Sequence, residues 1–361
     1  MAWCGRTENR FRRRLARAAN RGVRCIQVNS LLMKILSAML LLAVAVCHAQ
    51  SSSGVPKPPW VNDSKPPGTK PSSTKPAEQN DDTTFKVDVK LVNVFVTVTD
   101  ERGAPVAGLS KDNFQVLEDG DLQKISVFDK ESELPLSIVL DIDTSLSTRR
   151  VLPLELNSAR RFAQAILRPV DGLSLYGFSE VVDQVVQFTA DLKTIDRGID
   201  HLPLGAATAL YDAIYLGAEA LDGRQGRKVM VVITDGGDTV SKMDYQQAVR
   251  AAQISEAIVY SIIVVPIEAS AGRDTGGEHA LIQLSEDTGG KYFYATTLPE
   301  LDRAFHTISD ELRTQYLLAY YPARRIADSD FRRIEVKLAG LTSGSDYKTR
   351  HRTGYYTSKL H

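Results

Sequence analysis

The chain has 361 residues, and its 44 lysines and arginines are balanced by 44 aspartates and glutamates. This length allows two or three domains. The charge is unevenly distributed, because residues 1–49 hold nine of the basic residues and one acid, which leaves the remainder with a net charge of −8. Nucleic-acid binding requires a cationic surface, so the composition argues against it. A hydrophobic fraction of 43% excludes wholesale disorder, and only one apolar run nears membrane-spanning length, which excludes a polytopic membrane protein.

Residues 1–49 are predicted to be a signal peptide. A basic stretch precedes the apolar run 35–46, and Ala49 is a small residue at the expected cleavage point before Gln50. We therefore expect the protein to be exported and to be periplasmic, envelope-associated or secreted. An uncleaved membrane anchor and lipidation of Cys47 are alternatives, and the true start codon stays open. All three cysteines lie in this leader, so the mature chain would have no disulfide and no thiolate metal site.

Three further segments flank or precede the main body of the chain. Residues 50–84 are rich in proline, serine and lysine and predict a linker, either a spacer from a membrane or wall or a simple connection. Residues 85–130 alternate apolar and polar side chains and predict strands, with a hairpin around the Asp-Gly pair at 119–120 that pairs with 125–128. Residues 314–357 have the same β character. Because each β segment is small, we expect the two to pack in one module, such as a β-sandwich.

Residues 134–312 have a different sequence pattern, in which short aliphatic segments typical of strands alternate with segments that have helical periodicity. This alternation predicts the α/β fold class, with a doubly wound, mainly parallel central sheet covered on both faces. Open sheets of this type bind ligands at the carboxyl ends of their strands. The expected strands are 137–142, 173–178, 229–234, 258–265 and 291–294.

Hydroxyl and carboxylate side chains collect at this rim of the predicted sheet. Asp143, Ser145 and Ser147 follow the first strand. Thr208 directly precedes a helix, and Asp235 follows the third strand. Hard oxygen donors of this kind suit Mg²⁺, Mn²⁺ or Ca²⁺, whereas the sequence offers no Cys/His set for Zn²⁺.

The Asp-x-Ser-x-Ser, Gly-x-x-Thr and Thr-Asp-Gly motifs, in this order and spacing, resemble the metal-ion-dependent adhesion site of von Willebrand factor A domains. The resemblance covers about residues 134–312. It implies that one coordination position is left for an acidic residue of a protein partner. It also implies which residues hold the cation: Ser145, Ser147 and Thr208 directly, and Asp143 and Asp235 through water.

The chain departs from this family pattern at Leu146, where many relatives have glycine, which leaves the metal preference open. The flanking segments, with Asp112-Asn113-Phe114 and 315–320, resemble exported bacterial proteins of the VWA-related, acidobacterial type. That resemblance covers nearly the whole mature chain but implies no established activity.

A protein-binding function follows from the site and from the motifs that the sequence lacks. Neither a Gly-x-Ser-x-Gly elbow nor a phosphate-binding glycine loop is present, so we do not expect an enzyme. We expect an exported module that captures an acidic residue of a partner protein through a divalent cation. The alternative is a structural or assembly component of the envelope in which the metal stiffens the domain.

Two further acids near the rim have open roles. Asp141 lies two residues before Asp143, but only Asp143 has the motif spacing, so Asp141 is expected to make a polar contact within the sheet. Asp238 would either support the metal site from behind or be a solvated loop residue.

Overall fold

The computed structural model describes residues 91–130, 134–265, 275–324, 331–341 and 347–357. The predicted signal peptide and linker, and residues 85–90 of the first predicted strand, lie outside these ranges. No helix within them is both long enough and apolar enough to cross a membrane.

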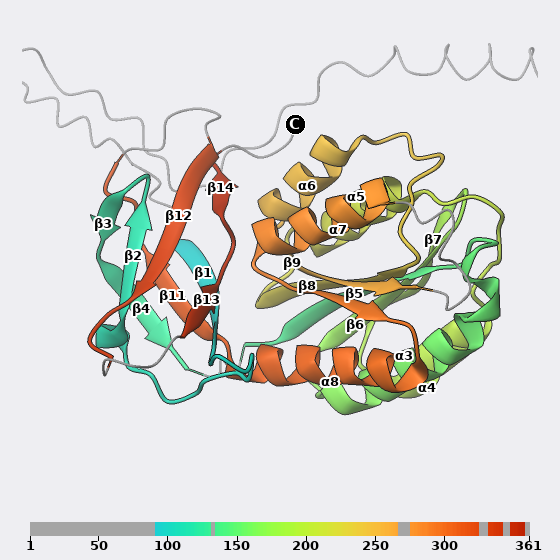
Figure 1. Cartoon of the computed structure of the whole chain (residues 1–361), viewed down its shortest axis with the longest axis horizontal. Coiled ribbons are helices and arrows are strands. Elements are labelled where there is room, and N and C mark those ends of the chain that lie inside the picture. The colour runs from blue at the N-terminus through green and yellow to red at the C-terminus, as the bar shows by residue number, and fades with distance from the viewer. Residues whose placement is uncertain (1–90, 131–133, 266–274, 325–330, 342–346, 358–361) are drawn as a thin grey trace, which may run out of the picture. The chain divides into compact units, whose positions relative to one another are not determined.

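A six-stranded sheet forms the centre of the α/β domain, in the order β10-β9-β8-β5-β6-β7 (Figure 1). Neighbouring strands are parallel except for the antiparallel pair β6 and β7, so the predicted mainly parallel sheet is confirmed. Strand β5 is buried along its whole length because both faces of the sheet are covered. The strands are β5 (Leu136–Asp143), β6 (Gly172–Phe178), β7 (Val182–Thr189), β8 (Arg227–Thr234), β9 (Ile258–Val264) and β10 (Tyr292–Ala295).

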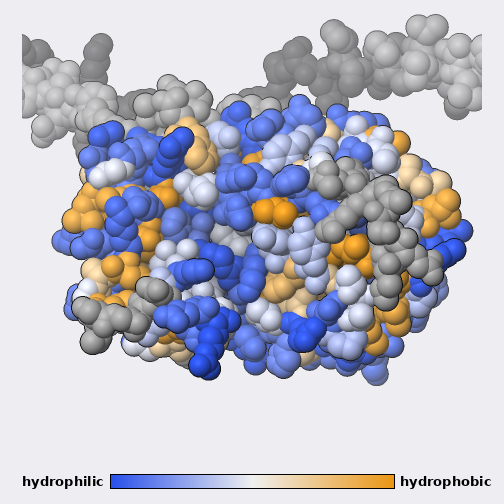
Figure 2. Space-filling view, in the orientation of Figure 1, coloured by the Kyte–Doolittle hydropathy of each residue, from blue (hydrophilic) through white to orange (hydrophobic). Residues whose placement is uncertain are grey.

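Helices pack on both faces of this sheet, with α3, α4 and α8 on one side and α5, α6 and α7 on the other (Figure 1). Each face has its own apolar core, and Phe162 and Phe305 stack between α3 and α8 with ring centroids 4.7 Å apart. On the face in Figure 2, hydrophilic residues predominate and apolar ones form separate patches. The helices are α3 (Leu152–Ile166), α4 (Leu192–Asp200), α5 (Leu210–Leu221), α6 (Tyr245–Ile254), α7 (Thr275–Thr288) and α8 (Leu298–Thr314).

Strand β7 and helix α4 have no counterpart among the elements predicted from the sequence. Strand β7 lies at the edge of the sheet, and only Val186 in it is buried, so its hydrophobic alternation is weak. Helix α4 begins after Asp191, whose carboxylate accepts hydrogen bonds from the backbone N–H groups of Lys193 and Thr194.

Strands from both flanking segments pair in one β module, as predicted. Its two four-stranded sheets have the orders β13-β1-β11-β4 and β14-β12-β2-β3. Val94 and Tyr316 from the first sheet share an apolar core with Val116 and Ile334 from the second. The strands are β1 (Val92–Thr99), β2 (Phe114–Glu118), β3 (Asp121–Gln123), β4 (Ile125–Asp129), β11 (Tyr316–Tyr320), β12 (Phe331–Leu338), β13 (Lys348–Arg350) and β14 (Gly354–Tyr356).

The hairpin turn at 119–120 is present, but the prediction of its second strand was wrong. Asp119 and Gly120 have φ values of 50° and 88°, as a two-residue hairpin turn with both central residues left-handed requires. This tight turn pairs β2 with β3, in the register Glu118 opposite Asp121. Residues 125–128 lie in β4, which pairs with β11 in the other sheet. The chain therefore changes sheets directly after the hairpin.

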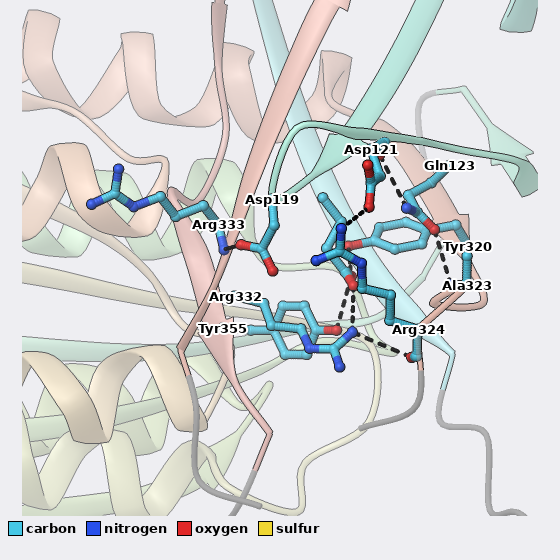
Figure 3. A network of polar contacts seen from close by, with 10 residues as sticks. Asp119, Asp121, Gln123, Tyr320, Ala323, Arg324, Arg332, Arg333 and Tyr355 are labelled. Atoms are coloured by element: carbon cyan, nitrogen blue, oxygen red, sulfur yellow. Dashed lines mark hydrogen bonds and ion pairs between the residues drawn. The ribbon is translucent and has the colours of Figure 1, made fainter. Parts of the chain in front are cut away.

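A buried ion pair lies within the β module (Figure 3). Glu118 on β2 is 3% exposed and accepts a hydrogen bond of 2.5 Å from Nη1 of Arg332 on β12. The hydroxyls of Tyr320 and Tyr355 donate to the other carboxylate oxygen at 2.7 and 2.9 Å. The four side chains come from β2, β12, β11 and β14, so this network joins the two sheets of the module.

The β module is attached to the α/β domain through the segment around β13 and β14. The Arg350 guanidinium pairs with Glu311 of α8 at 2.6 Å and donates to the carbonyl of Gly290 at 2.7 Å. The Thr353 N–H donates to the carbonyl of Asp287 at 2.9 Å. Gly290 and Asp287 lie near the start of β10, at the amino ends of the parallel strands. This attachment leaves the opposite, carboxyl rim of the sheet to the three predicted loops.

Candidate metal centre

Asp143 ends strand β5 and joins two of the rim loops. Its side chain is fully buried. One carboxylate oxygen accepts the backbone N–H of Ser145 at 2.9 Å, and the other accepts the hydroxyl of Thr234 at 2.6 Å. Because Thr234 ends the neighbouring strand β8, this carboxylate holds the serine loop against the Thr-Asp-Gly loop.

The serine loop turns its two hydroxyls toward each other. The Oγ atoms of Ser145 and Ser147 are 3.0 Å apart. The buried hydroxyl of Thr148 donates to the carbonyls of Asp143 and Ser145 at 3.0 and 3.1 Å, which closes the loop. Asp235 accepts a hydrogen bond from the Ser147 side chain. The structure therefore brings four of the five predicted residues into one contiguous group.

Thr208, the fifth predicted residue, is placed beside this group by the backbone of its loop. The N–H of Gly205 donates to the carbonyl of Thr144 at 3.1 Å. On its other side, Thr208 exchanges hydrogen bonds with Thr239, whose N–H donates to the Thr208 carbonyl at 2.8 Å. A glycine is required at 205 because a Cβ there would lie 2.2 Å from the Oγ of Ser179. Thr208 thus lies between the serine loop and the loop that follows β8.

The carboxylates of this group are short of positive charge. Burial raises the pKa of Asp143 to about 6, although the hydrogen bonds from Thr234 and Ser145 lower it, and the nearby Asp235 adds to the rise. Burial also raises the pKa of Asp235. Among the described residues, no lysine, arginine or histidine forms an ion pair with either carboxylate. A buried anionic site of this kind needs a proton or a cation to be stable.

The donor set fits a hard divalent cation. Three residues with hydroxyls and two with carboxylates lie on the loops of this rim, and oxygen donors of this type suit Mg²⁺, Mn²⁺ or Ca²⁺. Within the described part of the chain, no group of three or more His, Cys, Asp or Glu side chains could hold a metal.

Sequence reasoning missed Glu155 in the first turn of α3. This side chain is 1% exposed, and neither of its carboxylate oxygens has a hydrogen-bond partner. Burial raises its pKa well above the ordinary value, and the charges of Asp143 and Asp235 raise it further. A sequence signal was available, because Glu155 interrupts the apolar stripe that Leu152 and Ala159 form along the buried face of the helix.

The prediction that Asp141 makes a polar contact within the sheet was wrong. Both carboxylate oxygens of Asp141 are buried without a hydrogen-bond partner, and burial raises its pKa well above the ordinary value. It faces the core under α5, where a Cβ at Gly217 would lie 3.3 Å from its Oδ2. The glycine leaves room for the carboxyl group but offers no donor.

Asp238 supports the loop that carries Thr208. Its carboxylate accepts the hydroxyl of Ser241 and the backbone N–H of Tyr211, at 2.5 and 3.3 Å. Because Tyr211 lies in the first turn of α5, Asp238 joins the loop after β8 to the start of that helix.

Residues 138–237 match the von Willebrand factor type A domain, and this range contains all three rim loops. The α/β domain has the von Willebrand factor A fold and is called the A domain below. The matched part begins in β5 of the A domain and ends just after β8. No match is found among curated proteins.

Several solved structures are similar to this chain at low sequence identity. The conserved hypothetical protein BatB from Bacteroides thetaiotaomicron is 18% identical, with a TM-score of 0.40, over 50% of this chain and 100% of that one. A von Willebrand factor type A protein from Catenulispora acidiphila is 10% identical, with a TM-score of 0.44, over 72% and 73%. The vWF domain of the type V pili tip protein Mfa5 from Porphyromonas gingivalis is 13% identical, with a TM-score of 0.40, over 49% and 94%.

We expect Mg²⁺ to raise the melting temperature of the metal-free protein less at acidic pH than at neutral pH. The pKa of Asp143 is raised in the folded state, so this group favours folding at low pH, and that contribution is lost as the pH rises from about 4 through about 6. Mg²⁺ requires the ionised form, so the melting temperature gain on adding Mg²⁺ should be larger at about pH 7.5 than at about pH 5. Differential scanning fluorimetry in Mg²⁺ and in EDTA measures the gain.

The gain, and not the absolute melting temperature, is the proper readout for this pH test. The pKa values of other acidic residues are lowered in the folded state. Asp171 is an example, because hydrogen bonds from the Arg168 side chain and from the Leu136 and Arg168 N–H groups lower its pKa despite its burial. Their contribution is the same with and without Mg²⁺ and cancels in the difference. Asp143→Asn should flatten the pH dependence of the gain. An equal gain at both pH values would contradict the assignment of Asp143 to the site.

Proposed function

We propose that this protein is an exported binding module whose A domain captures an acidic group of a protein partner through a divalent cation. The observation that carries the proposal is a buried carboxylate, Asp143, and a half-buried one, Asp235, without basic partners and beside three hydroxyl residues at the sheet rim. Ser145, Ser147 and Thr208 would hold the ion, with Asp143 and Asp235 supplying charge behind them. Neutral hydroxyl ligands keep the ion electrophilic enough to attract a further carboxylate.

The surroundings of the rim favour a protein partner over a small free anion. Leu146 lies between the two serines and is 57% exposed. Val181 and Leu204, on the adjoining loops, are 57% and 55% exposed, and Val240, whose N–H donates to the Thr208 carbonyl, is 46% exposed. Exposed aliphatic side chains around a charged centre resemble the apolar contacts that accompany a polar anchor in protein interfaces.

The leader sequence supports export. A basic stretch followed by the apolar run 35–46 and a small residue at 49 is typical of a secretory signal peptide. The proline-rich residues 50–84 would then separate the A domain from the membrane or wall. A partner at the cell envelope is the consequence of this location.

Chelator-sensitive capture from an envelope extract tests the proposal. Immobilised protein is incubated with extract in Mg²⁺ or in EDTA, beside a Ser145→Ala, Ser147→Ala double variant as the matched control. We expect specific proteins to be retained by the parent in Mg²⁺ only, and to be released by EDTA. Capture that is equal in EDTA, together with a large fall in melting temperature, would instead favour a scaffold that the metal stiffens.

A further inference from the structure

Glu155 lies in the first turn of α3, the helix that follows the serine loop in the chain. The Val151 N–H donates to the Thr148 carbonyl at 2.9 Å, and the Glu155 N–H donates to the Val151 carbonyl at 3.2 Å. Thr148, in the 3-10 turn that precedes α3, and Leu152 and Glu155, in the first turn of α3, are all buried. Side chains on a helix lean toward its N-terminus, so we expect the carboxylate of Glu155 to extend back toward Thr148.

The hydroxyl of Thr148 is itself bonded to the metal loop. It donates to the carbonyls of Asp143 and Ser145, the residues that begin the Asp-x-Ser-x-Ser motif. Glu155 is 1% exposed whereas Leu146 in the serine loop is 57% exposed, so the Glu155 carboxylate cannot take a solvent-facing coordination position. The electrostatic coupling of Glu155 to both Asp143 and Asp235 is consistent with this placement.

The environment of Glu155 leaves it without any protein donor. Among the described residues, none donates a hydrogen bond to either of its oxygens, although the side chain is 1% exposed. A carboxylate in that position is costly when ionised, and two neighbouring carboxylates increase the cost. The N-terminal turn of α3 provides a modest favourable field, which is smaller than the penalty of full burial.

We propose that Glu155 is a third acidic group of the metal centre, which balances the charge of the cation from the buried side without occupying the partner's coordination position. The proposal rests on the proposed cation site and adds a residue to it. Glu155 acts through its charge and does not bind the cation directly. Its negative charge strengthens cation binding, and the cation in turn offsets the cost of burying the carboxylate. The competing reading is a carboxyl group that stays protonated in the core with or without metal.

Glu155→Gln separates the two readings, because it preserves shape and removes charge. We expect Mg²⁺ to bind the variant about 10-fold to 100-fold more weakly than the parent, as measured by calorimetry. In EDTA at neutral pH, the variant should melt at a higher temperature than the parent, because an uncompensated buried charge has been removed. Glu155→Asp, which keeps the charge, should recover part of the Mg²⁺ affinity.

Asp141→Asn is the matched control. Asp141 is also a buried carboxyl group without a hydrogen-bond partner, but it faces the core under α5 and not the serine loop. We expect its conservative change to alter the melting temperature and to leave Mg²⁺ affinity unchanged.

The outcomes distinguish this proposal from the cation site itself. If Glu155→Gln binds Mg²⁺ as tightly as the parent, the role of Glu155 is overturned. The cation site itself stands in that case if Asp143→Ala binds Mg²⁺ more weakly than the parent. Equal losses of Mg²⁺ affinity in Glu155→Gln and Asp141→Asn also overturn the role of Glu155, because they would reflect a general effect of changing a buried carboxyl group. Failure of the parent to bind Mg²⁺, Mn²⁺ or Ca²⁺ overturns both the cation site and the role of Glu155.

Discussion

Asp143→Ala is expected to weaken Mg²⁺ binding by about 100-fold or more, the largest effect of any single change at the rim. The substitution removes a charge and also the two hydrogen bonds that hold the serine loop and Thr234 together. The serine hydroxyls would then lose the geometry in which their oxygens are 3.0 Å apart. Calorimetric titration with Mg²⁺ and Mn²⁺ measures the loss.

Two companion variants define the expected ranking at the rim. Thr208→Ala removes one neutral oxygen and should weaken Mg²⁺ binding by about 10-fold, a smaller effect than that of Asp143→Ala. Asp141→Ala should leave the affinity intact, since the side chain lies in the core under α5. If Asp143→Ala binds Mg²⁺ like the parent, or if Asp141→Ala alone abolishes binding, the site has been assigned to the wrong residues.

Glu118→Ala is expected to lower the free energy of unfolding by about 3–5 kcal/mol. The change would leave the Arg332 guanidinium, in a residue that is 6% exposed, without its charged partner. The hydroxyls of Tyr320 and Tyr355 would lose their common acceptor as well. Urea denaturation followed by circular dichroism measures the difference, and Mg²⁺ affinity should not change because the network lies in the β module (Figure 3).

An exposed ion pair close to this network provides the control. Asp121 pairs with Arg324, and their side chains are 52% and 63% exposed. Asp121→Ala should change the free energy of unfolding by less than about 1 kcal/mol, because water and salt screen exposed pairs. Similar losses in Asp121→Ala and Glu118→Ala would show that burial of the Glu118 pair is not the reason for its effect.

The rim of the A domain could be predicted from the sequence because its information is local. Each of the three motifs occupies a few consecutive residues, and strand–helix alternation places the carboxyl ends of the parallel strands at one edge. Short aliphatic runs likewise predicted the strands that became β5, β6, β8 and β9. Edge strand β7 escaped prediction because only Val186 in it is buried.

The environments of single acids depended on the tertiary structure. Asp141 and Asp143 are two residues apart on one strand, yet Asp143 accepts two hydrogen bonds at the rim and Asp141 has none in the core. The environment of Glu155 could not be predicted for the same reason, since periodicity shows that a side chain is buried but not which residues surround it. Packing of α3 against the sheet placed Glu155 where the charges of Asp143 and Asp235 raise its pKa further than burial alone.

The sequence by itself determined the α/β alternation, the β character of both flanking segments and the order of the metal-site motifs, because these follow from short-range periodicity and spacing. Only the tertiary structure decided which strands pair across the chain. Glu118 and Arg332 are 214 residues apart, and β4 follows the β2–β3 hairpin in the chain but pairs with β11 in the other sheet. Such pairings arise from burial shared between distant segments, and no local pattern in either segment specifies its partner.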